Sequence, residues 1–398
     1  MKKNTANGLT VILGAILLQL SIGSIYSWSL FNQPLINKLQ VSESEVSLTF
    51  SITVFTFAFI TIFSGKLQDK IGPKLVAMLG GLFFGVGFIL TSNASSLIQL
   101  YIYYGVIVAI GVGFVYVCPL STCIKWFPDR KGLITGIVVG AFGLGSLVFK
   151  TVTQQLLQSR GISQTFFYLG IIHVILILVG SQFLKLPSNE NENTAASNNA
   201  QSAAKNFTTA EMIKAKPFYL LWIIYFFGCI SGLLIIGLAT DIGVHMVGLK
   251  QDTAANAVAV IALFNAGGRI IWGTFSDKVG RIKVVTMLSF ITTFCMIILS
   301  TVPLNYLIFL VTLSGIAFCF GGFLSVFPAI TGEFYGLKNL GANYGIIYQA
   351  YGLSALIGPL IEIIAGGLKP AFIICAILSA VGGSLTFMVK EVSSNTSI

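Results

Sequence analysis

The sequence predicts an all-α integral membrane protein, with twelve transmembrane helices in two six-helix halves related by a parallel pseudo-two-fold repeat. Of the 398 residues, 55% are hydrophobic and only 9% are charged, whereas a soluble domain carries about 25% charged residues. Apolar segments long enough to cross a hydrocarbon core of about 30 Å recur along the chain. A polar segment divides these segments into two groups, and two motifs occur once in each group.

Each apolar segment is expected to form a helix, because lipid offers the backbone no hydrogen-bond partners. The first six spans are expected at 8–31, 44–64, 75–93, 97–123, 133–157 and 163–184. The second six are expected at 218–240, 253–273, 284–302, 304–330, 343–366 and 369–389. The first apolar run follows two lysines and lacks a cleavage site, which favours a first span over a removed signal peptide.

A polar connector separates the two groups of spans. Residues 187–216 are rich in Asn, Ser, Ala and Glu, which is the composition of a flexible linker. We therefore expect three parts: an N-terminal six-helix half at 1–186, a cytoplasmic linker at 187–216 and a C-terminal six-helix half at 217–398.

The basic residues predict the orientation of the chain in the membrane. With the N-terminus inside, seventeen of the 23 Lys and Arg residues fall on the cytoplasmic face and four fall outside. The remaining two, Lys150 and Arg269, fall within spans. The net charge of +10 then reflects membrane topology and not a nucleic-acid partner. We expect a multi-pass protein of the plasma or inner membrane, surrounded by lipid, with both termini in the cytoplasm.

Two motifs repeat between the halves. Residues 65–74, after the second span, match residues 273–283, after the eighth, at an offset of 208. Residues 136–144 in the fifth span match residues 345–353 in the eleventh at an offset of 209. Repeats at nearly one offset imply parallel halves related by an axis along the membrane normal.

The first of these motifs, Gly-x-x-x-Asp-Lys-x-Gly followed by basic residues, resembles the hallmark loop of the major facilitator superfamily. The chain resembles that superfamily over nearly its full length. The glycines permit close helix approach, and the aspartate can accept hydrogen bonds from helix N-terminal amides. The motif is therefore expected to latch one state of a cytoplasmic gate. Its expected gating residues are Gly65, Asp69, Gly72, Gly273, Asp277, Gly280 and Arg281.

Arg269 is the most informative residue of the sequence. An arginine at the centre of a membrane helix costs about 2.5–3.5 kcal/mol on insertion scales, so such residues usually have a function. No acidic residue lies within four positions on either side, and the planar guanidinium matches a carboxylate. Asn265, one turn earlier, can add an amide contact, and Gly267 and Gly268 leave room. The alternative is a structural arginine, bonded to backbone or helix ends near the gate.

Three runs resemble the oxalate/formate antiporter family and its monocarboxylate-transporter relatives. They are 23–29 (Gly-Ser-Ile-Tyr-Ser-Trp-Ser), 125–132 (Lys-Trp-Phe-Pro-Asp-Arg-Lys-Gly) and 265–269 (Asn-Ala-Gly-Gly-Arg). In that family the eighth-helix arginine binds a substrate carboxylate, and aromatic residues of helices one, four and ten surround the substrate. The resemblance therefore implies that Arg269 is the anchor. It also implies five candidate residues that line the substrate site: Tyr26, Trp28, Tyr116, Phe323 and Phe327. For each of them, simple packing between helices is an equally good explanation.

The chain departs from the family's oxalate pattern at Tyr351, where oxalate exchangers carry a lysine in the eleventh helix. A phenol can hydrogen-bond an oxygen but supplies no second charge, so pyruvate, lactate or formate is expected in preference to oxalate. Packing is the alternative role of Tyr351. Lys150, in the fifth span, either draws anions into an outer vestibule, pairs with Glu362 or snorkels outward.

These features predict a secondary active transporter of a small organic anion, most specifically a monocarboxylate, which works by alternating access and needs no cofactor or metal. A dicarboxylate exchanger and a non-transporting membrane sensor for a carboxylate are the alternatives. Coupling to protons and exchange for a counter-anion are both open, and Asp241, His245 and His173 are the candidate titratable groups. For His173 the alternative is a hydrogen-bonded packing role. The sequence shows no paired carboxylates, metal cluster or activated nucleophile, which argues against an enzyme.

Overall fold

The computed structural model describes residues 2–187 and 206–389, and within these ranges the chain is helical and contains no β-strand. Most of the expected linker, 188–205, lies outside the described residues. The same holds for Lys205 and Lys390, two of the basic residues expected on the cytoplasmic face. At Asp241 the helix is described but the side chain is not.

The spans expected in the N-terminal half all coincide with helices. The elements are α1 (Lys2–Gly23), α2 (Ser29–Leu39), α3 (Glu43–Ile71), α4 (Pro73–Ser92), α5 (Leu97–Leu100), α6 (Ala109–Trp126) and α7 (Lys131–Ser181). A 3₁₀ turn, Ser24–Ser27, separates α1 from α2, and a π-helical segment, Tyr101–Val108, joins α5 to α6. The fifth and sixth expected spans are both contained in α7, which non-helical backbone interrupts at Gly161 (φ 72°, ψ 174°).

The spans expected in the C-terminal half also coincide with helices. The elements are α9 (Thr209–Lys214), α10 (Lys216–Asp241), α11 (Gln251–Val279), α12 (Arg281–Thr301), α13 (Tyr306–Phe334), α14 (Leu340–Ile347), α15 (Gln349–Ala365) and α16 (Leu368–Leu385). The eleventh expected span is divided at Tyr348, so that α14 has 8 residues and α15 has 17.

Among the described residues, nine helical segments are long and apolar enough to cross a membrane. One of them, 128–181, holds two expected spans. The eighth expected span corresponds to α11, and the eleventh corresponds to α14 with α15. Every expected span therefore has a helical counterpart, and the expected all-helical membrane fold is confirmed.

Two helices continue well beyond their expected ends where the gate motif begins. The second span was expected to end at 64 and the eighth at 273, but α3 continues to Ile71 and α11 to Val279. Hydropathy marks the end of the apolar sequence and not the end of the helix. The helix can continue through the polar residues that follow. Both helices end at a glycine of the motif with positive φ, Gly72 (90°) and Gly280 (101°). Glycine adopts this conformation without a steric penalty.

The structure divides into two compact units. Unit 1 comprises Met1–Pro128, Ala141–Thr209 and Gly336–Gly352. Unit 2 comprises Asp129–Gly140, Ala210–Tyr335 and Leu353–Ile398. Each unit combines most of one expected half with a short segment of the other. The domain boundaries at 186 and 217 stay a prediction from the sequence.

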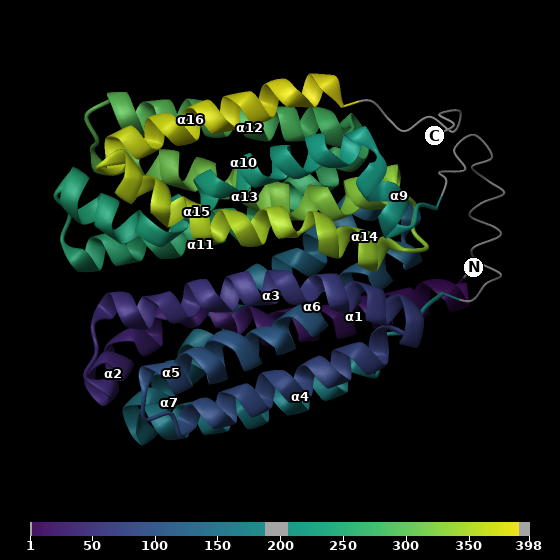
Figure 1. The fold of residues 1–398 in the computed structure, drawn as a ribbon, viewed down its shortest axis with the longest axis horizontal. Helices are drawn as coiled ribbons and strands as arrows, with labels where there is room; N and C mark the ends of the chain where they lie inside the picture. The colour runs from purple at the N-terminus through teal and green to yellow at the C-terminus, as the bar shows by residue number, and fades with distance from the viewer. Residues whose placement is uncertain (1, 188–205, 390–398) are drawn as a thin grey trace. The chain divides into compact units, whose positions relative to one another are not determined.

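Unit 1 is built around α6, which packs against α1, α3 and α4 (Figure 1). Small residues bring these helices close together: a Cβ on Gly80 would lie 2.8 Å from the Val115 side chain. The short helix α14 also belongs to unit 1, where it packs against α3.

Unit 2 is built around α13, which packs against α10, α11 and α12, while α16 packs on α10 and α12 (Figure 1). Its hydrophobic core includes Leu234, Met296, Leu313 and Phe372, all fully buried. Large apolar side chains also face outward, as expected for helices whose outer faces contact lipid. Examples are Leu263, Phe294, Leu307 and Val311.

Candidate functional site

Arg269 lies inside unit 2 on α11, and its side chain is 2% exposed. Its Nε donates a hydrogen bond to Oδ1 of Asn265 at 3.0 Å, so the contact expected one turn earlier on the helix is present. Its Nη1 donates to the backbone carbonyl of Val139, on α7, at 2.6 Å. The sequence did not indicate Val139 as the partner, but a bond to backbone is what the structural alternative for Arg269 expects.

Much of the hydrogen-bonding capacity of Arg269 is unused. A guanidinium has five N–H donors, and two are used in the bonds to Asn265 and Val139. Within 2–187 and 206–389, no carboxylate pairs with Arg269 and no further acceptor is bonded to it. Nδ2 of Asn265 is likewise buried without a partner among these residues. A buried charge without a counter-ion is strongly unfavourable, so an anion would be stabilised here.

Glycines place the α11 backbone in close contact with its neighbours around Arg269. A Cβ at Gly136 on α7 would overlap the Arg269 carbonyl oxygen, and a Cβ at Gly321 on α13 would overlap the Asn265 carbonyl oxygen. The two glycines before Arg269 differ. Gly268 lies against the Phe318 backbone, whereas a Cβ at Gly267 would meet no atom within 4 Å. Only Gly267 therefore leaves the room that the sequence predicted for both.

This difference gives a matched pair of variants. Gly268→Ala should destabilise the protein by about 1–3 kcal/mol, because the added methyl group forces α11 away from α13. Gly267→Ala should leave stability unchanged or raise it slightly, since alanine has the higher helix propensity. Thermal unfolding of the detergent-solubilised protein measures both. Equal melting temperatures for the two variants would contradict the close helix contact at Gly268.

Three predicted lining residues, Tyr26, Tyr116 and Tyr351, come together in unit 1. The hydroxyl groups of Tyr26 and Tyr351 are 2.8 Å apart and hydrogen-bonded. Tyr348 joins the others, since its ring centroid lies 4.9 Å from that of Tyr351 and 4.9 Å from that of Tyr116. Phe142 packs edge-on against Tyr26 at 5.1 Å. We call this group of rings the tyrosine cluster.

Sequence reasoning missed Tyr348 and Phe142 as members of the cluster. Both had a signal in the sequence. Phe142 matches Tyr351 in the repeat at an offset of 209, and Tyr348 lies three residues before Tyr351, on the same helix face.

The other predicted lining residues pack against different rings. Trp28 is buried in unit 1 with its ring 4.4 Å from Tyr104. In unit 2, Phe327 stacks on Tyr225 at 4.1 Å and is 6.3 Å from Phe323. These contacts are those of packed helices. Lys150 is exposed on α7, which fits the snorkelling alternative.

Of the candidate titratable groups, His173 is fully buried in unit 1. Both of its ring nitrogens are bonded to serine hydroxyls, at 2.8 Å for Ser21 and 3.1 Å for Ser24. His245 is exposed in a π-helical turn after α10. The geometry at His173 supports the packing alternative.

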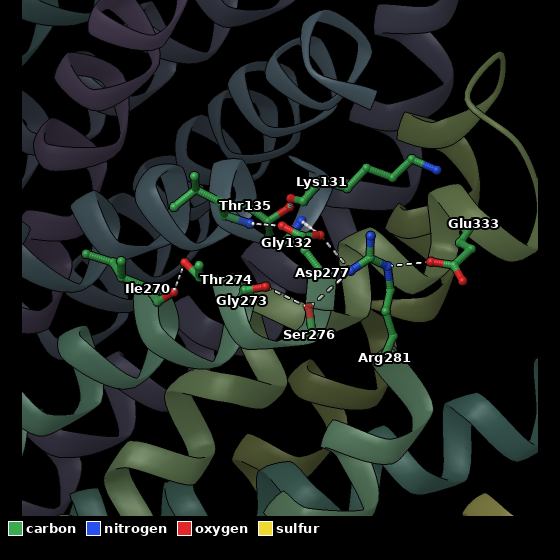
Figure 2. A network of polar contacts seen from close by, with 11 residues as sticks. Lys131, Gly132, Thr135, Ile270, Gly273, Thr274, Ser276, Asp277, Arg281 and Glu333 are labelled. Atoms are coloured by element: carbon green, nitrogen blue, oxygen red, sulfur yellow. Dashed lines mark hydrogen bonds and ion pairs between the residues drawn. The ribbon is translucent and has the colours of Figure 1, made fainter. Parts of the chain in front are cut away.

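The gate motif of unit 2 holds the start of α7 (Figure 2). The Asp277 carboxylate accepts hydrogen bonds from the backbone N–H groups of Gly132 at 2.9 Å and Leu133 at 2.8 Å. Arg281 Nη1 pairs with the same carboxylate at 2.9 Å, and Arg281 Nε pairs with Glu333 at 2.5 Å. Asp277 therefore neutralises the positive end of the α7 dipole while Arg281 balances its charge.

The gate motif of unit 1 repeats this arrangement at the start of α14. Asp69 accepts a hydrogen bond from the backbone N–H of Ala342 at 3.1 Å and lies 3.7 Å from Lys125 Nζ. The first glycine of each motif lets the two backbones touch. A Cβ on Gly65 would overlap the carbonyl oxygen of Gly341, and one on Gly273 would overlap that of Gly132.

The repeat also gives Arg269 a counterpart. At the offset of 208, Thr61 on α3 corresponds to Arg269 on α11. Gly345 lies against the Thr61 carbonyl oxygen just as Gly136 lies against that of Arg269. The Thr61 hydroxyl bonds the Gly345 carbonyl at 3.2 Å. The same position therefore carries a neutral side chain in unit 1 and a charge in unit 2.

Comparison with known families decides the class of the protein. The model of the Major Facilitator Superfamily matches residues 11–359, and a second match covers 247–397. The chain belongs to this superfamily. It is therefore a membrane transporter with several spanning helices and not an enzyme. The resemblance seen in the gate motifs is confirmed.

Curated relatives extend this comparison. The chain is 39% identical to "Uncharacterized MFS-type transporter YhjX" of Escherichia coli over 345 residues, covering 87% of this chain and 85% of the relative. It is 29% identical to "Oxalate:formate antiporter" of Oxalobacter formigenes, covering 96% and 91%. It is 22% identical to "Apicoplast pyruvate carrier 1" of Toxoplasma gondii, covering 89% and 83%.

Solved structures of the superfamily share the fold. The proton:xylose symporter XylE matches with a TM-score of 0.77 at 13% identity, covering 98% of this chain and 97% of that one. The transporter FucP matches with a TM-score of 0.71 at 15% identity, covering 96% and 100%. At this identity the likeness concerns the fold alone.

Proposed function

We propose that this transporter carries a small organic anion of the monocarboxylate class, such as pyruvate, lactate or formate, and that Arg269 binds its carboxylate. The observation that carries the proposal is the buried guanidinium with three unused N–H donors and no carboxylate partner among the described residues. A carboxylate supplies two acceptor oxygens and one negative charge, so it matches this arginine in both shape and charge.

The names of the relatives support an anionic cargo. One is an oxalate:formate antiporter and another a pyruvate carrier, while a mouse relative at 23% identity is "Monocarboxylate transporter 12". All three names refer to carboxylates or to carriers of them. A chain that carries a buried arginine and resembles such proteins over most of its length is well suited to the same class of cargo.

The tyrosine cluster favours a cargo with one carboxylate group over a cargo with two. Tyr351 stands where the family resemblance implies a lysine in oxalate exchangers, and its hydroxyl is bonded to that of Tyr26. Phenol groups can orient a neutral keto or hydroxyl oxygen, but they do not balance a second negative charge. The 29% identity to an oxalate:formate antiporter keeps a dicarboxylate exchanger as the second candidate.

Competition in proteoliposomes tests the substrate class. Uptake of radiolabelled pyruvate should be inhibited by unlabelled lactate and formate at concentrations at least about tenfold below those needed for oxalate, since a second buried charge without a partner costs more than about 1.4 kcal/mol. Stronger inhibition by oxalate would favour the dicarboxylate exchanger. Binding without any flux into the vesicles would identify a sensor.

The same vesicles decide how transport is coupled. Stimulation of uptake by an inward proton gradient indicates symport with protons. Stimulation by formate or lactate loaded inside the vesicle, with no proton gradient, indicates exchange for a counter-anion.

A further inference from the structure

The first transmembrane segment is broken by the 3₁₀ turn Ser24–Ser27, and contacts from α7 hold that turn. Gly23, just before the turn, touches the Phe142 carbonyl, and a Cβ would not fit between them. Ser27, at its end, donates a hydrogen bond to the Ser146 carbonyl at 3.2 Å. Such turns have poorer hydrogen-bond geometry than an α-helix, so outside contacts are needed to maintain this one.

His173, also on α7, supplies a further contact to the turn. Its imidazole is fully buried, with Nδ1 2.8 Å from the Ser21 hydroxyl and Nε2 3.1 Å from the Ser24 hydroxyl. Phe149 and Phe84 flank the ring at 4.5 Å and 5.1 Å. A neutral imidazole has one donor and one acceptor nitrogen, so one serine accepts a hydrogen bond and the other donates one. His173 thus connects the last turn of α1 to the 3₁₀ turn.

The 3₁₀ turn carries Tyr26, the member of the tyrosine cluster that bonds Tyr351 at 2.8 Å. We propose that His173 is a positioning residue: through Ser24 it fixes the 3₁₀ turn and thereby holds the Tyr26 hydroxyl against Tyr351. The transport consequence of this role rests on the proposed function, whereas its structural consequence does not. The imidazole itself touches no substrate.

Hydrogen exchange tests the structural consequence on the intact, purified protein without substrate. In His173→Leu and in Ser24→Ala, the amides of residues 24–28 should exchange about fivefold to tenfold faster than in the wild type, the effect of losing about 1 kcal/mol of hydrogen bonding. His173→Gln, whose side-chain amide can still bond Ser24, should stay within about twofold of the wild type. Unchanged exchange in Ser24→Ala would overturn the proposal, even if His173→Leu fails to fold.

Ser181→Ala provides a matched control on α7, the helix that carries His173. Ser181 is fully buried on α7, and among the described residues its hydroxyl bonds only the backbone of its own helix, at the Ile177 carbonyl. Ser181→Ala removes one buried hydroxyl, as Ser24→Ala does, but should leave the exchange of residues 24–28 at the wild-type rate. Faster exchange in this control would show a general loosening of unit 1 and would count against a specific role of His173.

Transport kinetics test the functional consequence. With labelled pyruvate, Ser24→Ala should raise KM about fivefold and change kcat less than about twofold, because Tyr26 is one of the lining residues that the family resemblance implies. A His173→Gln variant that keeps normal exchange but loses proton-driven uptake would assign His173 to proton transfer and overturn the positioning role. If the wild type transports no pyruvate, the proposed function fails, while the exchange experiment still decides what His173 does.

Discussion

Arg269→Gln should lower the kcat/KM of pyruvate uptake by at least about 100-fold. The variant loses the positive charge and the forked pair of donors, and each charge-assisted hydrogen bond to a carboxylate contributes about 1.5–3 kcal/mol. Two such bonds correspond to a factor of about 100 or more, since each 1.4 kcal/mol changes an equilibrium about tenfold. Uptake into proteoliposomes at a known protein density measures the effect.

The fold should survive this change. Glutamine Nε2 takes the place of arginine Nε and can still donate a hydrogen bond to Oδ1 of Asn265, and the substitution removes a buried charge that has no counter-ion among the described residues. The melting temperature of Arg269→Gln should therefore equal or exceed that of the wild type. Arg269→Lys keeps the charge but not the planar fork, so its activity should lie between the two.

Arg160→Gln provides the matched control. Arg160 is exposed on α7, and its substitution removes the same charge from a surface position. Uptake by this variant should stay within about twofold of the wild type, because exposed charges contribute little. Near-normal uptake by Arg269→Gln would defeat the assignment of Arg269 as the anchor, and an equal loss in Arg160→Gln would show a general charge effect.

Asp277→Asn should loosen the start of α7 from α11. Its carboxylate bonds the N–H groups of Gly132 and Leu133 and pairs with Arg281, and the amide cannot balance either the helix dipole or the arginine (Figure 2). Loss of an N-cap costs about 0.5–2 kcal/mol. A cysteine introduced by Thr135→Cys, at a fully buried position one turn into α7, should then react with N-ethylmaleimide roughly tenfold faster.

Asp129→Asn is the control for this gate experiment. Asp129 lies in the turn just before α7 and is exposed, so the substitution removes an equivalent charge without touching the cap. The native cysteines, all buried, should react slowly and give a low background. The cysteine introduced by Thr135→Cys is compared in the wild-type, Asp277→Asn and Asp129→Asn backgrounds. The same reaction rate in all three would show that Asp277 does not hold α7 in place.

Much of the fold follows from local patterns in the chain. Lipid forces every long apolar segment into a helix, so hydropathy alone locates the spans, although α3 and α11 continue beyond the ends that it gives. The motif repeated at an offset of 208 also has one local structure, since Gly72 and Gly280 adopt nearly the same backbone conformation. Arg269 stands out for the same physical reason, since a lone charge is conspicuous in an apolar helix.

The breaks inside the spans could not be predicted in this way. Neither the 3₁₀ turn at Ser24–Ser27 nor the division at Tyr348 is marked by a proline. At Tyr348 the break is held by Gln349, whose Nε2 donates to the carbonyl oxygens of Ala58 at 2.5 Å and Gly345 at 2.8 Å. A helix break that depends on a partner from another helix has no signature in its own segment.

The sequence determined the class of protein, its helices, its repeat and the position of the arginine that we propose as the anchor. The tertiary structure decided which side chains meet: Tyr26 with Tyr351, 325 residues apart, and Arg269 with the Val139 backbone. The physical reason is that hydropathy and charge act on each helix separately, and most faces of an apolar helix look alike in sequence. Which face is buried depends on close contacts between helices, such as Gly136 against the Arg269 carbonyl and Gly345 against the Thr61 carbonyl. These contacts form only when the helices pack against each other.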